Sequence, residues 1–129
     1  MIFGIGTDIV SVSRMQSALS RHGDRFAERI LAEVELEEYR QTAKPAHFLA
    51  KRFAAKEAAA KAIGTGFRDG ISMSDFIINH DDLGKPLLCF SGHAESFCHE
   101  QGVGESFISI SDEKEHAVAF VTLLKILKK

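Results

Sequence analysis

Two carboxylates and one lysine stand in settings that could support catalysis. Asp8 interrupts an apolar, β-branched segment near the amino end. Because a buried carboxylate without a partner is costly, we expect Asp8 to reach solvent or to meet a positive group. Glu57 and Lys61 are four residues apart in an alanine-rich segment, which would place them ~40° apart around a helix axis. Two interpretations stay open: an exposed ion pair that stabilises the helix by roughly a few tenths of a kcal/mol, or one side of a binding site.

The second interpretation is a site for phosphate chemistry. Two carboxylates can bind Mg²⁺, which needs only one or two protein oxygens and fills the rest of its octahedron with water and phosphate. A lysine one helical turn away would neutralise charge on the same phosphate. Asp8, Glu57 and Lys61 together are therefore typical of phosphoryl transfer, in which positioning and charge compensation do most of the catalysis.

Other sequence motifs do not match known kinds of site. Gly4-Ile5-Gly6 resembles the start of a dinucleotide fingerprint. However, position 9, where the third glycine should stand, is Ile, and no strand precedes Gly4. Gly64-Thr65-Gly66 follows a helix and lacks the Gly-Lys-Ser/Thr ending of a phosphate-binding loop. Cys89 and Cys98 do not have zinc-ligand spacing, and the histidines show no ligand pattern.

The charges are distributed unevenly along the chain. The formal net charge is -2, which does not favour a nucleic-acid partner. Residues 33–38 contain four glutamates and no base, whereas residues 44–68 are basic. Such a stretch favours a discrete anionic ligand, and the alternative is a solvated helix face. Its bases are Lys44, Lys51, Arg52, Lys56, Lys61 and Arg68.

Length and composition indicate one folded unit. The 129 residues are 45% hydrophobic and 26% charged, which is ordinary for a globular domain. A chain of this size folds without a disulfide or structural metal. No apolar run approaches the ~20 residues of a membrane span, and no signal-peptide pattern is visible. We expect a cytoplasmic protein with reduced thiols.

Hydrophobic patterning and helix breakers outline the elements that must position these side chains. Ser11 or Ser13 can cap the first helix, and Pro45 can open the longest one. We expect a strand at 2–12, helices ending at His22 and covering 24–31, 33–42 and 46–63, strands at 75–80 and 86–90, a helix from 91 or 92 to 101, and strands at 107–110 and 117–126. This order predicts an α+β fold, a single domain over 1–129 with an antiparallel sheet and a long central helix.

Two segments, the first of which contains Asp8, carry a specific resemblance. Residues 6–10, Gly-Thr-Asp-Ile-Val, and residues 52–66, Arg-Phe-Ala-Ala-Lys-Glu-Ala-Ala-Ala-Lys-Ala-Ile-Gly-Thr-Gly, resemble the holo-[acyl carrier protein] synthase family, the short group of 4'-phosphopantetheinyl transferases. Phe26–Leu31, Gly84–Pro86 and the segment around Ser109–Asp112 match as well. The resemblance covers essentially the whole chain and implies that family's fold.

The resemblance implies an activity. The family transfers 4'-phosphopantetheine from coenzyme A to a serine of apo acyl carrier protein, releasing adenosine 3',5'-bisphosphate, in support of fatty acid biosynthesis. Asp8 and Glu57 correspond to its Mg²⁺ carboxylates, and Lys61 to the lysine near the pyrophosphate. The resemblance does not assign the acceptor of the serine proton among a metal-bound water, Glu57 and Lys61.

The resemblance also implies binding residues and partners. The family is usually trimeric, with each site shared between subunits. Many relatives have His where this chain has Asp112, so we assign no catalytic histidine. Arg14, Arg21 and Arg25 become candidates for docking the acidic carrier protein. The coenzyme A contacts that it implies are Arg52, Lys61, Gly64, Thr65, Gly66, Gly84, Lys85 and Pro86.

Two rival hypotheses remain beside an Mg²⁺-dependent transferase. A non-catalytic module could bind coenzyme A or a carrier protein without reaction, but it would have no need of Asp8 and Glu57 as a metal pair. A plain structural oligomer would leave Asp8 in its apolar strand unexplained.

Overall fold

Long strands and one long helix dominate the fold. The computed structural model describes residues 1–127. Within them the chain forms two antiparallel sheets and five α-helices, with one short 3-10 helix, η1. The elements are β1 (Ile2–Ser11), α1 (Val12–His22), α2 (Asp24–Ile30), α3 (Glu33–Gln41), α4 (Pro45–Ile63), η1 (Met73–Asp75), β2 (Phe76–His80), β3 (Pro86–Phe90), α5 (Gly92–Gln101), β4 (Val103–Asp112) and β5 (His116–Lys125).

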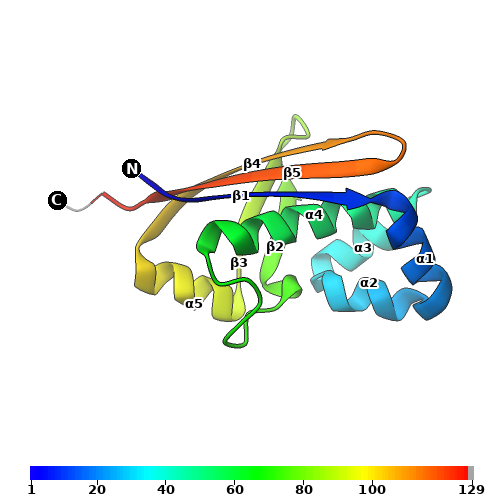
Figure 1. The fold of residues 1–129 in the computed structure, drawn as a ribbon, viewed down its shortest axis with the longest axis horizontal. Helices are drawn as coiled ribbons and strands as arrows, with labels where there is room; N and C mark the ends of the chain where they lie inside the picture. Colours follow the sequence, from blue (N-terminus) through cyan, green and yellow to red (C-terminus); the bar gives the residue numbers. More distant parts are fainter. Residues whose placement is uncertain (128–129) are drawn as a thin grey trace.

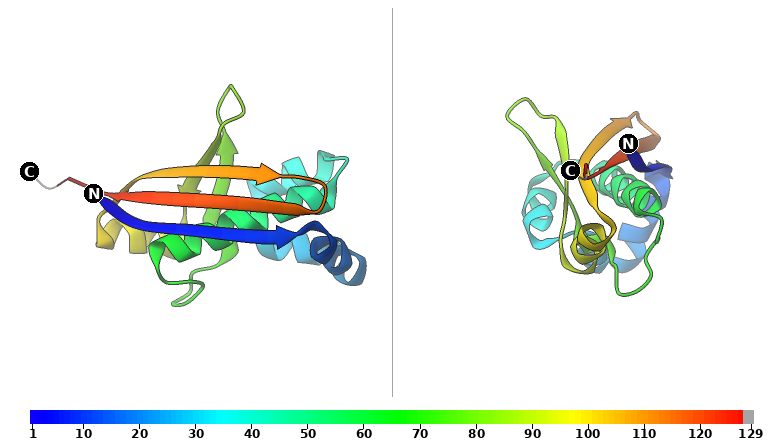
Figure 2. Two further views of the ribbon diagram at one scale, coloured as in Figure 1. Left: turned by 45° about the horizontal axis from the view of Figure 1, so that its top comes forward. Right: turned by 90° about the vertical axis from the view of Figure 1, so that its left-hand side faces the viewer.

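The larger sheet has the order β1-β5-β4, and α4 lies along one of its faces (Figure 1). The other helices lie on the same side as α4 (Figures 1 and 2). Alternate residues of β5 therefore point toward α4 and are buried, and these are Ala117, Ala119, Val121 and Leu123. The residues between them point the other way, to a face that no described element covers.

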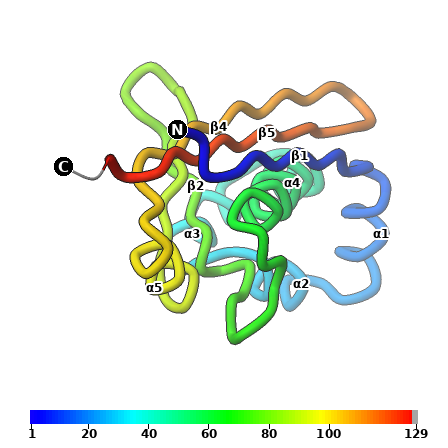
Figure 3. Tube along the Cα trace, turned by 60° about the vertical axis from the view of Figure 1, so that its left-hand side comes forward, coloured from blue at the N-terminus to red at the C-terminus, as the bar shows by residue number. Residues whose placement is uncertain are grey.

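Helix α4 lies directly beside β1 (Figure 3), and the two backbones approach each other closely. Gly4 and Gly6 make this approach possible, because a Cβ on either would overlap the helix backbone. A Cβ on Gly4 would lie 1.9 Å from the carbonyl oxygen of Ala62, and a Cβ on Gly6 would lie 1.8 Å from that of Ala58. The alanines of α4 complete the contact with small side chains, and most of the helix is buried.

The second sheet is the β2–β3 hairpin. It runs across the molecule behind α4, and its tip extends past the edge strand β4 (Figures 1 and 2). Ser106 of β4 donates a hydrogen bond to the Leu88 carbonyl (3.2 Å), linking the two sheets. At the tip, Asp81 Oδ1 accepts hydrogen bonds from the backbone N–H groups of Leu83 and Lys85, which fixes the turn.

The predicted α+β fold with a long central helix is confirmed, with corrections at element ends. Val12 begins α1 instead of ending β1, because Ser11 caps this helix by accepting a hydrogen bond from Arg14 N. Asp75 lies in η1, not in a strand. Strand β4 begins at Val103, earlier than the predicted 107, because pairing with β5 extends it through polar and glycine residues of low strand propensity.

None of the helices in the described part of the chain is long and apolar enough to cross a membrane.

Candidate active site

Asp8 and Lys61 meet where β1 passes the last turn of α4. The Lys61 ammonium donates a hydrogen bond to Asp8 Oδ1 (3.2 Å) and another to the Thr7 carbonyl (2.9 Å). The Asp8 side chain is 18% exposed and that of Lys61 53%, so the pair lies at the surface. Lys61 is thus the positive group that meets Asp8. Within residues 1–127 no ion pair joins Lys61 to Glu57. Lys61 therefore pairs with Asp8 of β1 and not with the residue one turn before it on the helix.

Glu57 belongs to the same group of charges. Burial raises the pKa of its carboxyl, and the negative charge of nearby Asp8 raises that pKa further. Lys61 and Arg14 act in the opposite direction, but the net displacement of the pKa is upward. The two carboxylates therefore lie close enough to repel each other, although they come from β1 and α4.

This pair of carboxylates fits Mg²⁺. Both supply hard oxygen donors, and a divalent cation between them would remove the repulsion that raises the pKa of Glu57. Among residues 1–127 no three His, Cys, Asp or Glu side chains gather into a metal site. Two protein oxygens nevertheless suit Mg²⁺, which keeps several water or phosphate ligands.

A groove of about 450 Å³ lies beside Arg14, between α1, α2 and α4. Arg14, Arg21 and Arg29 line it, and Phe26 and Phe53 give it an apolar part. Two of the three predicted docking arginines therefore share one groove. Arg25 is exposed on α2 but does not line the groove.

Other residues that the family resemblance assigns to coenzyme A lie at the opposite edge of the large sheet. A hollow of about 360 Å³ beside β4 is lined by Arg52, Gly84, Pro86 and Asp112, among others. Lys85 is exposed at the base of the same turn. Since the sheet order is β1-β5-β4, this hollow and the Asp8 group are at different edges of one chain.

Two larger hollows, of about 680 and 760 Å³, adjoin the amino end of α4 and the β4–β5 turn. Lys44, His47 and Lys114 line both, and Lys51 and Asp112 line one. The lining is thus rich in bases, although the carboxylate pair is elsewhere. Sequence reasoning noted the basic stretch but did not connect Lys114, seventy residues after Lys44, with it.

The predicted glycine turn ends α4. Gly64 has a left-handed backbone (φ 86°), and its N–H donates to the Ala60 and Lys61 carbonyls. Gly66 N–H also donates to Ala60 (3.3 Å), and Thr65 Oγ1 donates to the Gly66 carbonyl (2.8 Å). The turn therefore follows Lys61 directly and is fixed by its own hydrogen bonds.

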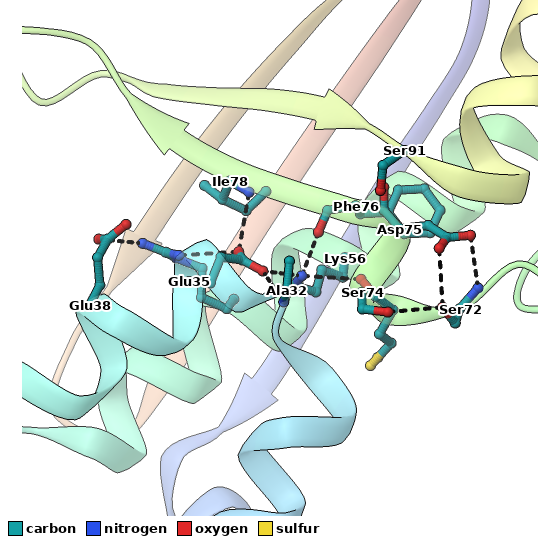
Figure 4. A network of polar contacts seen from close by, with 12 residues as sticks. Ala32, Glu35, Glu38, Lys56, Ser72, Ser74, Asp75, Phe76, Ile78 and Ser91 are labelled. Atoms are coloured by element: carbon teal, nitrogen blue, oxygen red, sulfur yellow. Dashed lines mark hydrogen bonds and ion pairs between the residues drawn. The ribbon is translucent and has the colours of Figure 1, made fainter.

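Two members of the basic stretch face the protein interior, contrary to both sequence interpretations of that stretch. Lys56 is fully buried and Arg52 nearly so, and both form ion pairs with the buried Glu35 of α3 (Figure 4). The acidic segment 33–38 is thus the partner of part of the basic one. Burial lowers the pKa of Lys56, and the Glu35 charge opposes that change. Sequence spacing held no signal for this long-range pairing.

A match to a family model covers residues 4–121, which includes both carboxylates, Lys61 and both hairpins. That model describes the 4'-phosphopantetheinyl transferase superfamily. The chain belongs to this superfamily. A holo-[acyl-carrier-protein] synthase from Halorhodospira halophila is 56% identical over 124 residues, which are 96% of this chain and 98% of the relative.

Solved structures of superfamily members have the same fold. A holo-[acyl-carrier-protein] synthase from Neisseria meningitidis superposes with a TM-score of 0.90 at 49% identity, covering 97% of this chain and all of the other. One from Bacillus anthracis, in complex with coenzyme A (3',5'-ADP), has a TM-score of 0.78 at 40% identity, covering 95% and 96%. The resemblance inferred from sequence motifs is confirmed.

Proposed function

We propose that this chain is a holo-[acyl carrier protein] synthase, which transfers 4'-phosphopantetheine from coenzyme A to a serine of apo acyl carrier protein and releases adenosine 3',5'-bisphosphate. The observation that carries the proposal is the convergence of Asp8 and Glu57 beside the Lys61 ammonium, in a chain of this superfamily. Both cysteines are free thiols, which fits a cytoplasmic enzyme supporting fatty acid biosynthesis.

In the reaction, the serine oxygen forms a bond to the β-phosphorus of coenzyme A as the bond from that phosphorus to the bridging oxygen breaks. Asp8 and Glu57 would hold Mg²⁺, which when bound supplies charge neutralisation at the diphosphate. The Lys61 ammonium, held over β1 by the Thr7 carbonyl, compensates charge on the same diphosphate. The leaving group departs as adenosine 3',5'-bisphosphate, and the serine proton is released.

We further propose a homotrimer with its sites at subunit contacts. An apolar face of the large sheet is open, and Ile5, Ile9, Phe107 and Phe120 are exposed on it. The residues attributed to coenzyme A lie at both edges of that sheet, so one chain does not gather them. A closed ring in which the β1 edge of one copy meets the β4 edge of the next would unite them and cover the face.

The groove lined by Arg14 and Arg21 is proposed as the docking site for the carrier protein. Guanidinium groups there would attract an acidic partner, and Phe26 and Phe53 offer apolar contact. The groove adjoins the reaction centre, since the Arg14 charge acts on Glu57. A docked carrier would thus present its serine near the carboxylates.

The decisive experiment measures the intact mass of apo carrier protein after incubation with coenzyme A and Mg²⁺. Transferase activity adds the mass of one phosphopantetheine group, and a chelator abolishes the gain. No gain with a folded carrier, over a range of divalent metals, would support the alternative of a non-catalytic coenzyme A or carrier-protein binding module.

Single substitutions test the metal pair. Asp8→Ala and Glu57→Ala should each abolish the mass gain while the circular dichroism spectrum stays that of the parent protein, because neither carboxylate is in the core. Near-normal turnover in both variants would contradict the assignment of Mg²⁺ to these residues.

A further inference from the structure

We infer that the buried Lys56–Glu35 ion pair is a positioning device that fixes the rotation of α4 and so aims Glu57 at Asp8. This inference rests on the proposed metal site. Lys56 immediately precedes Glu57, so their side chains leave the helix about 100° apart. Glu57 lies within range of the charges of Asp8 and Arg14, and Lys56 points into the interior toward α3.

All three donors of the Lys56 ammonium are used. They bond to Glu35 Oε1 (2.6 Å), to the Met73 carbonyl (3.1 Å) and to the Phe76 carbonyl (Figure 4). Met73 and Phe76 lie at the entry to β2, after the loop that follows α4. One buried side chain therefore ties α4 to α3 and to the start of the hairpin.

Glu35 completes the network from the other side. Its Oε1 also accepts from Ala32 N (2.9 Å), and its Oε2 accepts from Arg52 Nη1 (3.1 Å) and Ile78 N (3.2 Å). Arg52 lies one helical turn before Lys56 on the same face of α4. Two cations of α4 are thus held by one carboxylate of α3, which also accepts a hydrogen bond from the backbone of β2.

Stability alone is a poor reason for such a network. Removing charges from water costs several kcal/mol per ion, and apolar residues of similar volume often serve a core equally well. What buried polar groups can provide is a unique packing register. This matters for α4, because over Gly4 and Gly6 its backbone lies directly against β1, and most of its other buried residues are alanines. Such a smooth surface allows close approach but has few projections to fix a rotation.

The rotation of α4 decides the site. Glu57 and Lys61 share the face toward β1, and Arg52 and Lys56 share the face toward α3. Fixing the second face therefore fixes the first. A carboxylate metal site requires this, because changes in the groups that orient metal ligands commonly cost about 10- to 100-fold in affinity.

Direct binding of Mn²⁺, which prefers the same oxygen ligands as Mg²⁺, tests the inference by electron paramagnetic resonance. Lys56→Met should raise the Mn²⁺ dissociation constant about tenfold. A purely electrostatic effect has the opposite sign, since loss of a nearby positive charge favours cation binding. Glu35→Gln should also weaken Mn²⁺ binding, and Glu37→Gln, on the exposed side of the same helix, should leave it unchanged.

A double variant separates positioning from general loosening of the fold. If Lys56 acts through Glu57, Lys56→Met should add little to the loss in a Glu57→Gln background. Fully additive losses, or tighter binding by Lys56→Met, would overturn the inference. If Lys56→Met does not fold, the same cycle is run with Glu35→Gln. Unchanged Mn²⁺ affinity in Glu57→Gln alone would instead refute the proposed metal site.

Discussion

The α carbon of Gly6 faces the carbonyl oxygen of Ala58 so closely that a Cβ on Gly6 would lie 1.8 Å from that oxygen. Backbone atoms of β1 and α4 are therefore in direct contact, without intervening side chains. Asp8 lies two residues after Gly6, and Glu57 lies next to Ala58. The glycine thus sets the spacing between the two carboxylates.

Gly6→Ala should force β1 and α4 apart. We predict a loss of about 1–3 kcal/mol in the free energy of unfolding, typical of overpacking, and weaker Mn²⁺ binding in the folded protein. Urea denaturation and metal titration measure the two effects. Gly104→Ala is the control, because its new Cβ would lie 3.2 Å from Cγ1 of Ile126 and no closer than 3.5 Å to any backbone atom of another strand. Equal behaviour of the two variants would contradict this role for Gly6.

The pKa of Glu57 should respond to its neighbours with opposite signs. Asp8→Asn removes a negative charge that raises this pKa, so the pKa should fall. Lys61→Met removes a positive charge that lowers it, so the pKa should rise further. Carboxyl NMR titrations in metal-free buffer measure both. Displacements in the same direction would show that the two side chains do not act on Glu57 through their charges.

Arg14→Glu should impair recognition of the carrier protein. The reversed charge in the groove would repel an acidic partner, and we predict a rise of roughly tenfold or more in the KM for carrier protein, with a much smaller rise for coenzyme A. The attraction between the parent protein and the carrier protein should weaken as the salt concentration increases. Arg40→Glu, on the exposed side of α3, is the control. Similar increases in both KM values would undo the docking proposal.

Phe120→Asp should weaken self-association. Phe120 is exposed at the centre of the open sheet face, where a carboxylate would be buried in the proposed trimer. Sedimentation velocity should detect smaller species. If the active sites are shared between subunits, activity should be lost as the trimer dissociates. Val34→Asp, an equally exposed apolar position on α3, should sediment as the parent does. A parent protein that is monomeric at assay concentration would contradict the trimer.

The two thiols should differ in reactivity. Burial raises the pKa of Cys98 to about 11, so little of it is thiolate at pH 8, whereas Cys89 is exposed on β3. Mass spectrometry after brief treatment with iodoacetamide should find one modification, at Cys89. Denaturant should release the second. Equal labelling of both thiols in the native protein would mean that the carboxyl end of α5 opens readily.

Local patterning was enough for the elements and for naming Asp8, Glu57 and Lys61 as candidate site residues. Pro45 and Gly64 bound the long helix, and the helical spacing of Glu57 and Lys61 follows from their positions alone. An aspartate within an apolar strand needs solvent or a positive partner in any fold, and Asp8 meets the Lys61 ammonium. The elements could be predicted in this way because capping, periodicity and burial costs act over a few residues.

Tertiary structure decided which charges meet. Lys61 pairs with Asp8 instead of Glu57, and Lys56 turns inward to Glu35, although it belongs to a stretch that sequence reasoning assigned to solvent or ligand. Ion pairs between distant segments depend on how helices and sheets pack, and no local spacing encodes them. The contact of Gly6 with the α4 backbone is of the same kind, since only the packed pair of elements shows why a side chain there has no room.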